Sequence, residues 1–407
     1  MPGTVDIWLA VVGGMAVVLA FLSEGIRRLP LSEALLGLVL GVVAGPQVLG
    51  VLDVGGHDPN ALVLESSRLL LGVALMAVAL RYPPRELAAR AGRAALAVAV
   101  AMPAMAGVTA LLGVWVLDVS GGVALLLGAV LSPTDPVLAS AVVTGEPAEE
   151  DVPARLRHLL SLESGANDGL ALPLVLLGIA VVGGDGIGGT LAAAAWQVGG
   201  AVAIGTLLGA GIGRGIRHVH ARHEVGEPVV TVFTLLLALF ALGVARLAGT
   251  SGILAVFVTG LAYNVAASGA ERRPEVTLDE TLNRFAVLPV FTLLGVVVPW
   301  EVWGDLGWPL AAFVVAVLVL RRLPVIALLA RPLGLDAAGV AYYGWFGPMG
   351  ASSVLYLAHA HHEGITDPVL WGVGTAVVCA SVVAHGVTAA PGRRAYVVLS
   401  RAGRGAN

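Results

Sequence analysis

The feature that most constrains this chain is a succession of apolar stretches, each close to the ~20 residues that an α-helix needs to cross a bilayer. Thirteen such stretches can be distinguished, at residues 6–23, 31–52, 63–80, 93–117, 121–144, 158–182, 190–213, 228–248, 251–268, 284–300, 308–330, 337–359 and 367–390. Hydrophobic residues make up 57% of the chain and charged residues only 12%, which excludes an ordinary soluble domain. The sequence therefore predicts an all-α polytopic membrane protein with about 13 transmembrane helices.

The distribution of the arginines predicts how the chain is oriented in the membrane. All 23 basic residues are arginine, and 19 of them lie in alternate loops between the stretches or after the last one. The other set of loops holds Arg246 alone, and Arg68, Arg321 and Arg322 fall within or beside apolar stretches. Because arginine-rich loops stay in the cytoplasm, we expect a cytoplasmic C-terminus and, with an odd number of spans, an N-terminus outside.

A polar segment interrupts the sixth stretch. Residues 161–168 read Ser-Leu-Glu-Ser-Gly-Ala-Asn-Asp, so two carboxylates and an amide lie at membrane depth. Charged groups in hydrocarbon are costly and usually mark a pathway, a proton relay or an ion site. On a helix, Glu163 and Asn167 share one face, whereas Ser164 and Asp168 share another about 100° away. The first face suits a fixed structural pair and the second a hydrated cavity.

Two other stretches are broken in a matching way. The fifth contains Pro133 and Pro136 within Ser-Pro-Thr-Asp-Pro, and the twelfth contains Gly347, Pro348 and Gly350 within Gly-Pro-Met-Gly. Such residues break the helical hydrogen-bond ladder, which is tolerated at membrane depth only beside protein or water. The fifth and twelfth spans are equivalent in two six-span halves joined by the seventh. This pattern is typical of inverted repeats whose broken helices 5 and 12 cross at the midplane, where a transporter binds its substrate.

The residues at these positions suit a small hard cation. Asp135 can balance an exposed half-helix N-terminus, Thr134 offers a hydroxyl and a carbonyl, and Asp168 with Ser164 supplies a carboxylate and a second hydroxyl. Oxygen donors of this kind fit Na⁺ or Li⁺, and no histidine or cysteine stands at zinc-ligand spacing. The single cysteine, Cys379, excludes an internal disulfide. No cofactor and no nucleic-acid partner is expected.

Glu163 needs a cationic partner if it is ionised at membrane depth. Arg321 and Arg322 follow the apolar run 311–320 and are the candidates at this depth. Neighbours on a helix point about 100° apart, so we expect one of the two to hold Glu163 in a bidentate ion pair. We favour Arg321, with Arg322 as the alternative.

Together these motifs resemble a known family. Thr134-Asp135-Pro136 followed by Glu163-Ser164-x-x-Asn167-Asp168 is similar to the sodium/proton antiporters of the NhaP and eukaryotic sodium/proton exchanger kind. Further similarities are the Arg321 run, the segment from Gly344 to Pro348, and Ser381-x-x-x-His385-Gly386-x-Thr388. One departure is Met349, where members of that family often carry arginine.

The resemblance implies a fold, a reaction and a division of the chain. It implies exchange of Na⁺ (or Li⁺ or K⁺) for H⁺ across the cytoplasmic membrane by an elevator motion in a homodimer. Asp168 would carry cation and proton alternately, with Asn167 marking the electroneutral class. The implied parts are a dimerisation domain (residues 1–90 and 226–302), a core ion-translocation domain (91–185 and 303–391), a linker helix and cytoplasmic loop (186–225) and a short cytoplasmic tail (392–407).

Two other functions remain open at the level of sequence. An intramembrane aspartyl protease could use Asp135 and Asp168, but the paired breaks and the ion pair of Glu163 would then have no role. An ion channel or ion-sensing subunit would also need charged groups at membrane depth. Conductance measurements in planar bilayers and a peptide-cleavage assay would distinguish both from an antiporter.

Overall fold

The computed structural model describes residues 4–26, 32–56, 58–81, 83–220, 227–267 and 287–405, and within these ranges it contains helices and no strand. The all-α prediction is therefore confirmed. The helices of the first half are α1 (Thr4–Ile26), α2 (Glu33–Ala44), α3 (Pro59–Leu80), α4 (Pro84–Leu96), the π-helical η1 (Ala97–Ala101), α5 (Met102–Leu117), α6 (Gly121–Val130), α7 (Ser140–Val143), α8 (Glu146–Asp151), α9 (Ala154–Leu170) and α10 (Leu172–Gly183).

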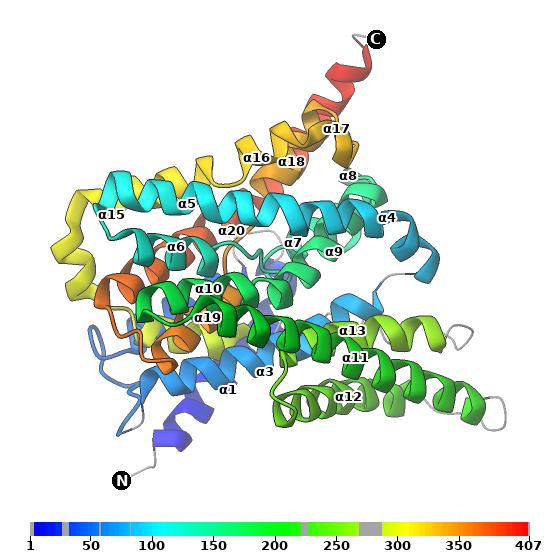
Figure 1. Ribbon diagram of the computed structural model, residues 1–407, viewed down its shortest axis with the longest axis horizontal. Coiled ribbons are helices and arrows are strands. Elements are labelled where there is room, and N and C mark those ends of the chain that lie inside the picture. The colour runs from blue at the N-terminus through cyan, green and yellow to red at the C-terminus, as the bar shows by residue number, and fades with distance from the viewer. Residues whose placement is uncertain are drawn as a thin grey trace.

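The second half of the chain continues the same pattern. Its helices are α11 (Ile187–His220), α12 (Glu227–Leu247), α13 (Gly252–Ala266), α15 (Trp300–Leu320), α16 (Leu323–Leu328), α17 (Ala330–Leu333), α18 (Ala337–Trp345), α19 (Ala351–His362) and α20 (Pro368–Gly405), with a further helix over Val287–Val296. Most of the longer helices run roughly alongside one another across the molecule (Figure 1).

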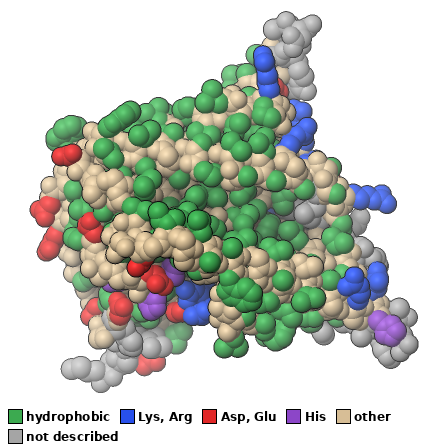
Figure 2. Space-filling model, viewed as in Figure 1, with side chains coloured by type: hydrophobic (Ala, Val, Ile, Leu, Met, Phe, Trp, Pro, Cys, Tyr) green, Lys and Arg blue, Asp and Glu red, His purple; other side chains and the backbone are tan. Residues whose placement is uncertain are grey.

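Several of these helices can cross a bilayer. Six in the described residues are long and apolar enough: Pro59–Leu80, Ala88–Leu117, Ala154–Gly183, Ile187–His218, Trp300–Leu328 and Pro368–Ala402. Six shorter apolar helices accompany them, and α18 and α19 lie on either side of a non-helical segment. On the face shown in Figure 2 most arginines gather toward the right-hand ends of the helices and most acidic side chains toward the left. This separation matches the charge asymmetry of the loops in the sequence.

Local sequence explains where many helices begin. The side chain of the residue before the helix accepts a hydrogen bond from the backbone N–H three positions later in α2, α6, α13 and α18, and the capping residues are Ser32, Ser120, Ser251 and Asp336. The αL conformation of Gly184 and Gly334 ends α10 and α17. These caps satisfy backbone groups that would otherwise be unpaired at the helix ends.

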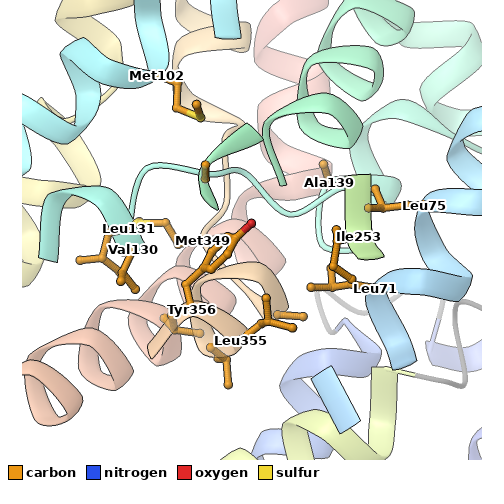
Figure 3. Packing of buried hydrophobic residues seen from close by; sticks show 14 of the residues in the cluster. Leu71, Leu75, Met102, Val130, Leu131, Ala139, Ile253, Met349, Leu355 and Tyr356 are labelled. Atoms are coloured by element: carbon orange, nitrogen blue, oxygen red, sulfur yellow. The ribbon is translucent and has the colours of Figure 1, made fainter. Parts of the chain in front are cut away.

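Two helical paths are interrupted in the interior. Between α6 and α7 the backbone is not helical over residues 131–139, and between α18 and α19 it is not helical over residues 346–350. The two interruptions touch, because the N–H of Asp135 donates to the carbonyl of Pro348 at 2.8 Å. Figure 3 shows Leu131 and Ala139, at the two ends of the first interruption, and Met349 of the second within one buried cluster. These segments form the region around which the candidate site is built.

Glycines bring α11 and α13 into close contact. A Cβ at Gly205, Gly209 or Gly213 would come within 3.0 Å or less of atoms of α13, including the carbonyl oxygens of Ala255, Thr259 and Tyr263. Spacing of four residues places these glycines on one face of α11, which lies beside α13 (Figure 1). Small residues at such spacing let membrane helices approach closely.

This contact predicts that Gly209→Ala destabilises the protein. The added methyl group would collide with the Thr259 backbone, so we expect a loss of ~1–3 kcal/mol, as for overpacked cores. Gly211→Ala is the matched control, because a Cβ there meets nothing within 4 Å and alanine favours a helix by ~0.5–1 kcal/mol. Thermal unfolding in detergent measures both variants. Equal midpoints for the two variants would contradict the proposed packing.

Candidate functional site

The polar segment of the sixth apolar stretch lies inside α9. This helix runs without interruption from Ala154 to Leu170 and continues through Ala171 into α10. Glu163, Ser164, Asn167 and Asp168 are all 0–1% exposed. The polar side chains on the two faces of α9 contact different parts of the protein.

Asn167 and Ser164 attach α9 to the first interruption. The Asn167 amide accepts a hydrogen bond from the N–H of Thr134 (3.1 Å) and donates to the hydroxyl of Thr134 (2.8 Å). It also donates to Glu163 at 3.4 Å. The hydroxyls of Thr134 and Ser164 are 2.9 Å apart. The structure thus brings together Thr134, Ser164 and Asn167, whose polar atoms satisfy one another.

Asp135 bridges the two interruptions. One carboxylate oxygen accepts hydrogen bonds from the N–H groups of Val137 (2.7 Å) and Leu138 (3.1 Å), and the other accepts one from the N–H of Ala351 (2.5 Å). Ala351 is the first residue of α19, where the helix dipole favours a negative charge. A Cβ at Gly350 would collide with this carboxylate, so the position requires glycine.

Asp168 differs from the other buried carboxylates in its hydrogen bonding. Both of its side-chain oxygens are buried, and neither accepts a hydrogen bond within the described part of the chain. Ser352 of α19 is close enough for its buried hydroxyl to interact electrostatically with this carboxylate, but the two groups do not reach hydrogen-bond geometry. The phenol of Tyr356 donates to the Asp168 carbonyl, which holds the backbone in place. A buried carboxylate without donors requires a proton or a cation.

Glu163 forms its ion pair with Arg322. The guanidinium reaches both carboxylate oxygens, at 2.8 and 2.6 Å, and both side chains are at most 3% exposed. The hydroxyl of Tyr343 donates to the same carboxylate at 2.8 Å, and Arg322 also donates to the Tyr343 carbonyl at 3.0 Å. Our preference for Arg321 is therefore wrong, and the alternative holds. Both arginines keep right-handed helical backbone angles after Leu320, so they point in different directions as expected, but a helical wheel does not show which of them packs against Glu163.

Arg321 contacts the backbone of the two interruptions. Its guanidinium donates to the carbonyl oxygens of Leu131 and of Ser132 (3.2 Å) in the first interruption. It also donates to the carbonyl of Gly347 (2.6 Å) in the second interruption. These carbonyls follow the ends of α6 and α18, where the helix dipole favours a positive charge. Arg321 thus balances the partial negative charge at the helix C-terminal ends beside the two interruptions, and Asp135 balances the partial positive charge at the N-terminal ends.

The second interruption is also held from α20. The hydroxyl of Ser381 accepts a hydrogen bond from the N–H of Met349 at 2.8 Å, and it lies 3.1 Å from a ring nitrogen of His385. The other ring nitrogen of His385 lies 2.9 Å from the Trp345 carbonyl. Met349 itself is buried. These bonds satisfy backbone groups that the break leaves unpaired.

The structure brings the predicted site residues together in one region. Thr134, Asp135, Ser164, Asn167 and Asp168 lie around the two interruptions, which contain the predicted break residues Pro133, Pro136, Gly347, Pro348 and Gly350. Sequence reasoning missed Tyr343, Ser352 and Tyr356. The pair Ser352-Ser353, directly after a break in an apolar run, was the available signal for one of them. Among the described residues, no three His, Cys, Asp or Glu side chains are grouped closely enough to hold a metal ion.

Comparisons with known proteins agree on one family. The family of sodium/hydrogen exchangers, transmembrane part, matches residues 15–392. The Na⁺/H⁺ antiporter 2 of Zygosaccharomyces rouxii is 30% identical over 81% of the chain and 42% of its own length. The K⁺/H⁺ antiporter NhaP of Alkalimonas amylolytica is 27% identical over 87% of the chain and 60% of its own length. The chain thus spans less than two thirds of these relatives.

A solved structure supports the same fold. The sodium proton antiporter MjNhaP1 of Methanocaldococcus jannaschii superposes with a TM-score of 0.75 at 18% identity, covering 97% of this chain and all of that one. The resemblance inferred from the motifs is confirmed by the family match. These relatives are transporters and not enzymes, so the comparisons support neither the intramembrane protease nor the channel.

The ion pair predicts a measurable coupling. Glu163→Gln and Arg322→Gln should each lower thermal stability in detergent, because a lone buried charge costs ~3–5 kcal/mol. The double variant should lose less than the sum of the two single losses, which gives a coupling energy well away from zero. Arg321→Gln combined with Glu163→Gln is the control for this coupling energy, since Arg321 makes its hydrogen bonds to backbone carbonyls and not to Glu163. Additive losses for Glu163 and Arg322 would contradict the pair.

Proposed function

Because the chain belongs to the sodium/hydrogen exchanger family, we propose that it exchanges a monovalent cation for protons across the membrane, with Asp168 as the shared binding group. The observation that carries this proposal is the state of Asp168: it is 1% exposed, and both of its side-chain oxygens lack a hydrogen-bond donor in the described chain. Such a carboxylate can hold either a proton or a partly dehydrated cation. Competition between the two for one site couples their movements.

The other buried carboxylates are occupied by fixed partners. Glu163 faces Arg322, and Asp135 accepts three backbone hydrogen bonds. We therefore assign structural roles to these two groups and assign ion carriage to Asp168. Ser164 and Thr134, whose hydroxyls lie 2.9 Å apart, would add oxygen ligands from α9 and the first interruption. Na⁺, Li⁺ and K⁺ all suit such a set of oxygen donors.

Asn167 supports electroneutral exchange. Its amide oxygen accepts a hydrogen bond from the Thr134 N–H, and its amide nitrogen donates to the Thr134 hydroxyl and to Glu163. A carboxylate here would lose both donated bonds and bring a second negative charge beside Glu163. We propose that Asn167 braces α9 and carries no proton, so that one proton moves per cation.

We propose an elevator motion of the core domain (residues 91–185 and 303–391) along the dimerisation domain (1–90 and 226–302). Support comes from the surface between them, where a Cβ at Gly169 of α9 would lie 2.7 Å from the Leu254 backbone of α13. Small residues at such a contact let the backbones of the two helices approach closely. We further propose a homodimer in the cytoplasmic membrane, with the arginine-rich ends of the helices in the cytoplasm.

The first prediction for this function is that Asp168→Asn folds but does not exchange ions. Asparagine is nearly isosteric and cannot carry the proton or the charge. Exchange is measured in proteoliposomes with an internal pH dye, using Na⁺, Li⁺ and K⁺ gradients in separate runs. The thermal unfolding midpoint checks that the variant folds. Cation-driven proton movement at the wild-type rate in Asp168→Asn would sink the assignment.

The second prediction concerns membrane potential. With one proton exchanged per monovalent cation, no net charge crosses the bilayer. Moving a unit charge through 100 mV is worth ~2.3 kcal/mol, so an electrogenic carrier would respond strongly. Rates in proteoliposomes should stay constant when valinomycin and K⁺ gradients set different potentials during Na⁺ exchange. A rate that follows the potential would exclude the stoichiometry.

The third prediction assigns a cation ligand to α19. Ser352 lies beside Asp168 with a buried, unpaired hydroxyl, so Ser352→Ala should raise the apparent KM for the cation several-fold while the protein stays folded. Ser353→Ala is the matched control: Ser353 is also fully buried with an unpaired hydroxyl, but as the next residue of α19 it points about 100° away from Ser352. An equal change of KM in both variants would reject Ser352 as a ligand.

A further inference from the structure

A groove lies between α11 and α13, away from the interrupted helices. Its volume is about 570 Å³, and it is lined by Thr206, Ala210, Arg214, Arg217, Val258, Leu261, Ala262, Val265 and Ala266. The lining residues of α11 recur every three or four positions, as do those of α13, so each helix contributes one stripe. Apart from Thr206 and the two arginines, the lining is apolar. The groove therefore has a hydrocarbon-like floor with two positive charges at one end.

The two arginines are exposed and have no ion pair in the described chain. Arg214 and Arg217 are three residues apart on α11, just after its apolar part, and neither donates a hydrogen bond or faces a carboxylate among the described residues. A guanidinium has five N–H donors and stays charged at all relevant pH values. Two of them side by side repel each other, so an anion that they share would be stabilised strongly.

The length of the groove matches one leaflet of a bilayer. From Thr206 to Arg217 the helix rises ~16 Å, at 1.5 Å per residue, and half of the ~30 Å hydrocarbon core is ~15 Å. With the arginines at the level of the lipid headgroups, the apolar part of the groove reaches the middle of the membrane. Successive glycines of α11 contact successive residues of α13 in the same chain order, so the two helices run parallel and both line the groove over this depth.

We propose that this groove binds one anionic phospholipid. Its phosphate would accept hydrogen bonds from Arg214 and Arg217, and one acyl chain would lie against Ala210 and the apolar stripe of α13. Charge complementarity favours this occupant, because a phosphate at the headgroup level meets both guanidinium groups while its acyl chain fills the apolar part. Basic pockets between membrane helices bind anionic lipid headgroups in this way.

The groove is a surface separate from Asp168, and lipid binding there does not depend on which ion is transported. None of the nine lining residues belongs to α9, α19 or the two interruptions. A lipid bound there would hold α11 against α13, two helices that already pack through Gly205, Gly209 and Gly213. It would therefore stabilise the protein without contacting the ion site.

Native mass spectrometry of the full chain in detergent tests the proposal. Dioleoylphosphatidylglycerol and dioleoylphosphatidylcholine are added at equal concentrations, and the bound copies of each are counted per chain. We expect a preference of about 30-fold for phosphatidylglycerol, which corresponds to about 1 kcal/mol for each of two arginines near a lipid surface. Arg214→Gln combined with Arg217→Gln should abolish this preference.

Two further variants make the result specific. Arg394→Gln combined with Arg401→Gln removes the same charge from two exposed arginines of α20 and should leave the preference unchanged. Ala210→Leu fills the groove while both arginines remain, and it should lower the number of bound phosphatidylglycerol molecules. This variant also tests the proposal if the double substitution in α11 does not fold, which the thermal unfolding midpoint reveals.

Three outcomes would overturn the proposal. The first is a wild-type protein with no preference for phosphatidylglycerol. The second is an equal loss in the α11 and α20 double variants, which would mean a general effect of charge. The third is a change of oligomeric mass in the α11 variant without a change in bound lipid, which would show that a second copy of the chain covers the groove.

Discussion

The structure depends on how two non-helical segments are satisfied inside an apolar protein. Backbone N–H and C=O groups cannot remain unpaired at membrane depth, because each would cost several kcal/mol. Here Arg321 donates to carbonyls of both segments, and Asp135 accepts hydrogen bonds from an N–H of the first segment and from the N–H of Ala351, which begins the helix after the second. The segments also bond directly through Asp135 and Pro348. One cation and one anion thus balance the four helix ends created by two breaks.

This balance decides which carboxylate is free to act. Three carboxylates are buried around the interruptions, and each has a different set of neighbours. Glu163 is neutralised by Arg322 and bonded by Tyr343, while Asp135 is held by backbone donors. Asp168 alone of the three has side-chain oxygens without donors in the described chain. The proposed exchange function follows from this difference, because only a group without fixed partners can change its ligand in each cycle.

Sequence reasoning could identify the helical class, the two breaks and the polar segment because these depend on local patterns. Pro133, Pro136, Pro348 and the surrounding glycines interrupt apolar runs, and a helical wheel separates Glu163 from Asp168. It could not choose between Arg321 and Arg322, because tertiary packing around the end of α15 decides which of the two reaches Glu163. The contacts of Tyr343, Ser352 and Tyr356 bring together residues more than 150 positions apart, which a single sequence does not reveal.

Proton and cation compete for Asp168 in the proposed mechanism, and the pH dependence of cation affinity tests this competition most directly. Exchange rates of the wild-type protein in proteoliposomes would be measured over a range of Na⁺ concentrations at a series of pH values. Competition at one carboxylate predicts that the apparent KM for Na⁺ rises tenfold for each unit of decreasing pH below the pKa of the site, with an unchanged maximal rate. An apparent KM that stays constant across pH, with only the maximal rate changing, would contradict the account.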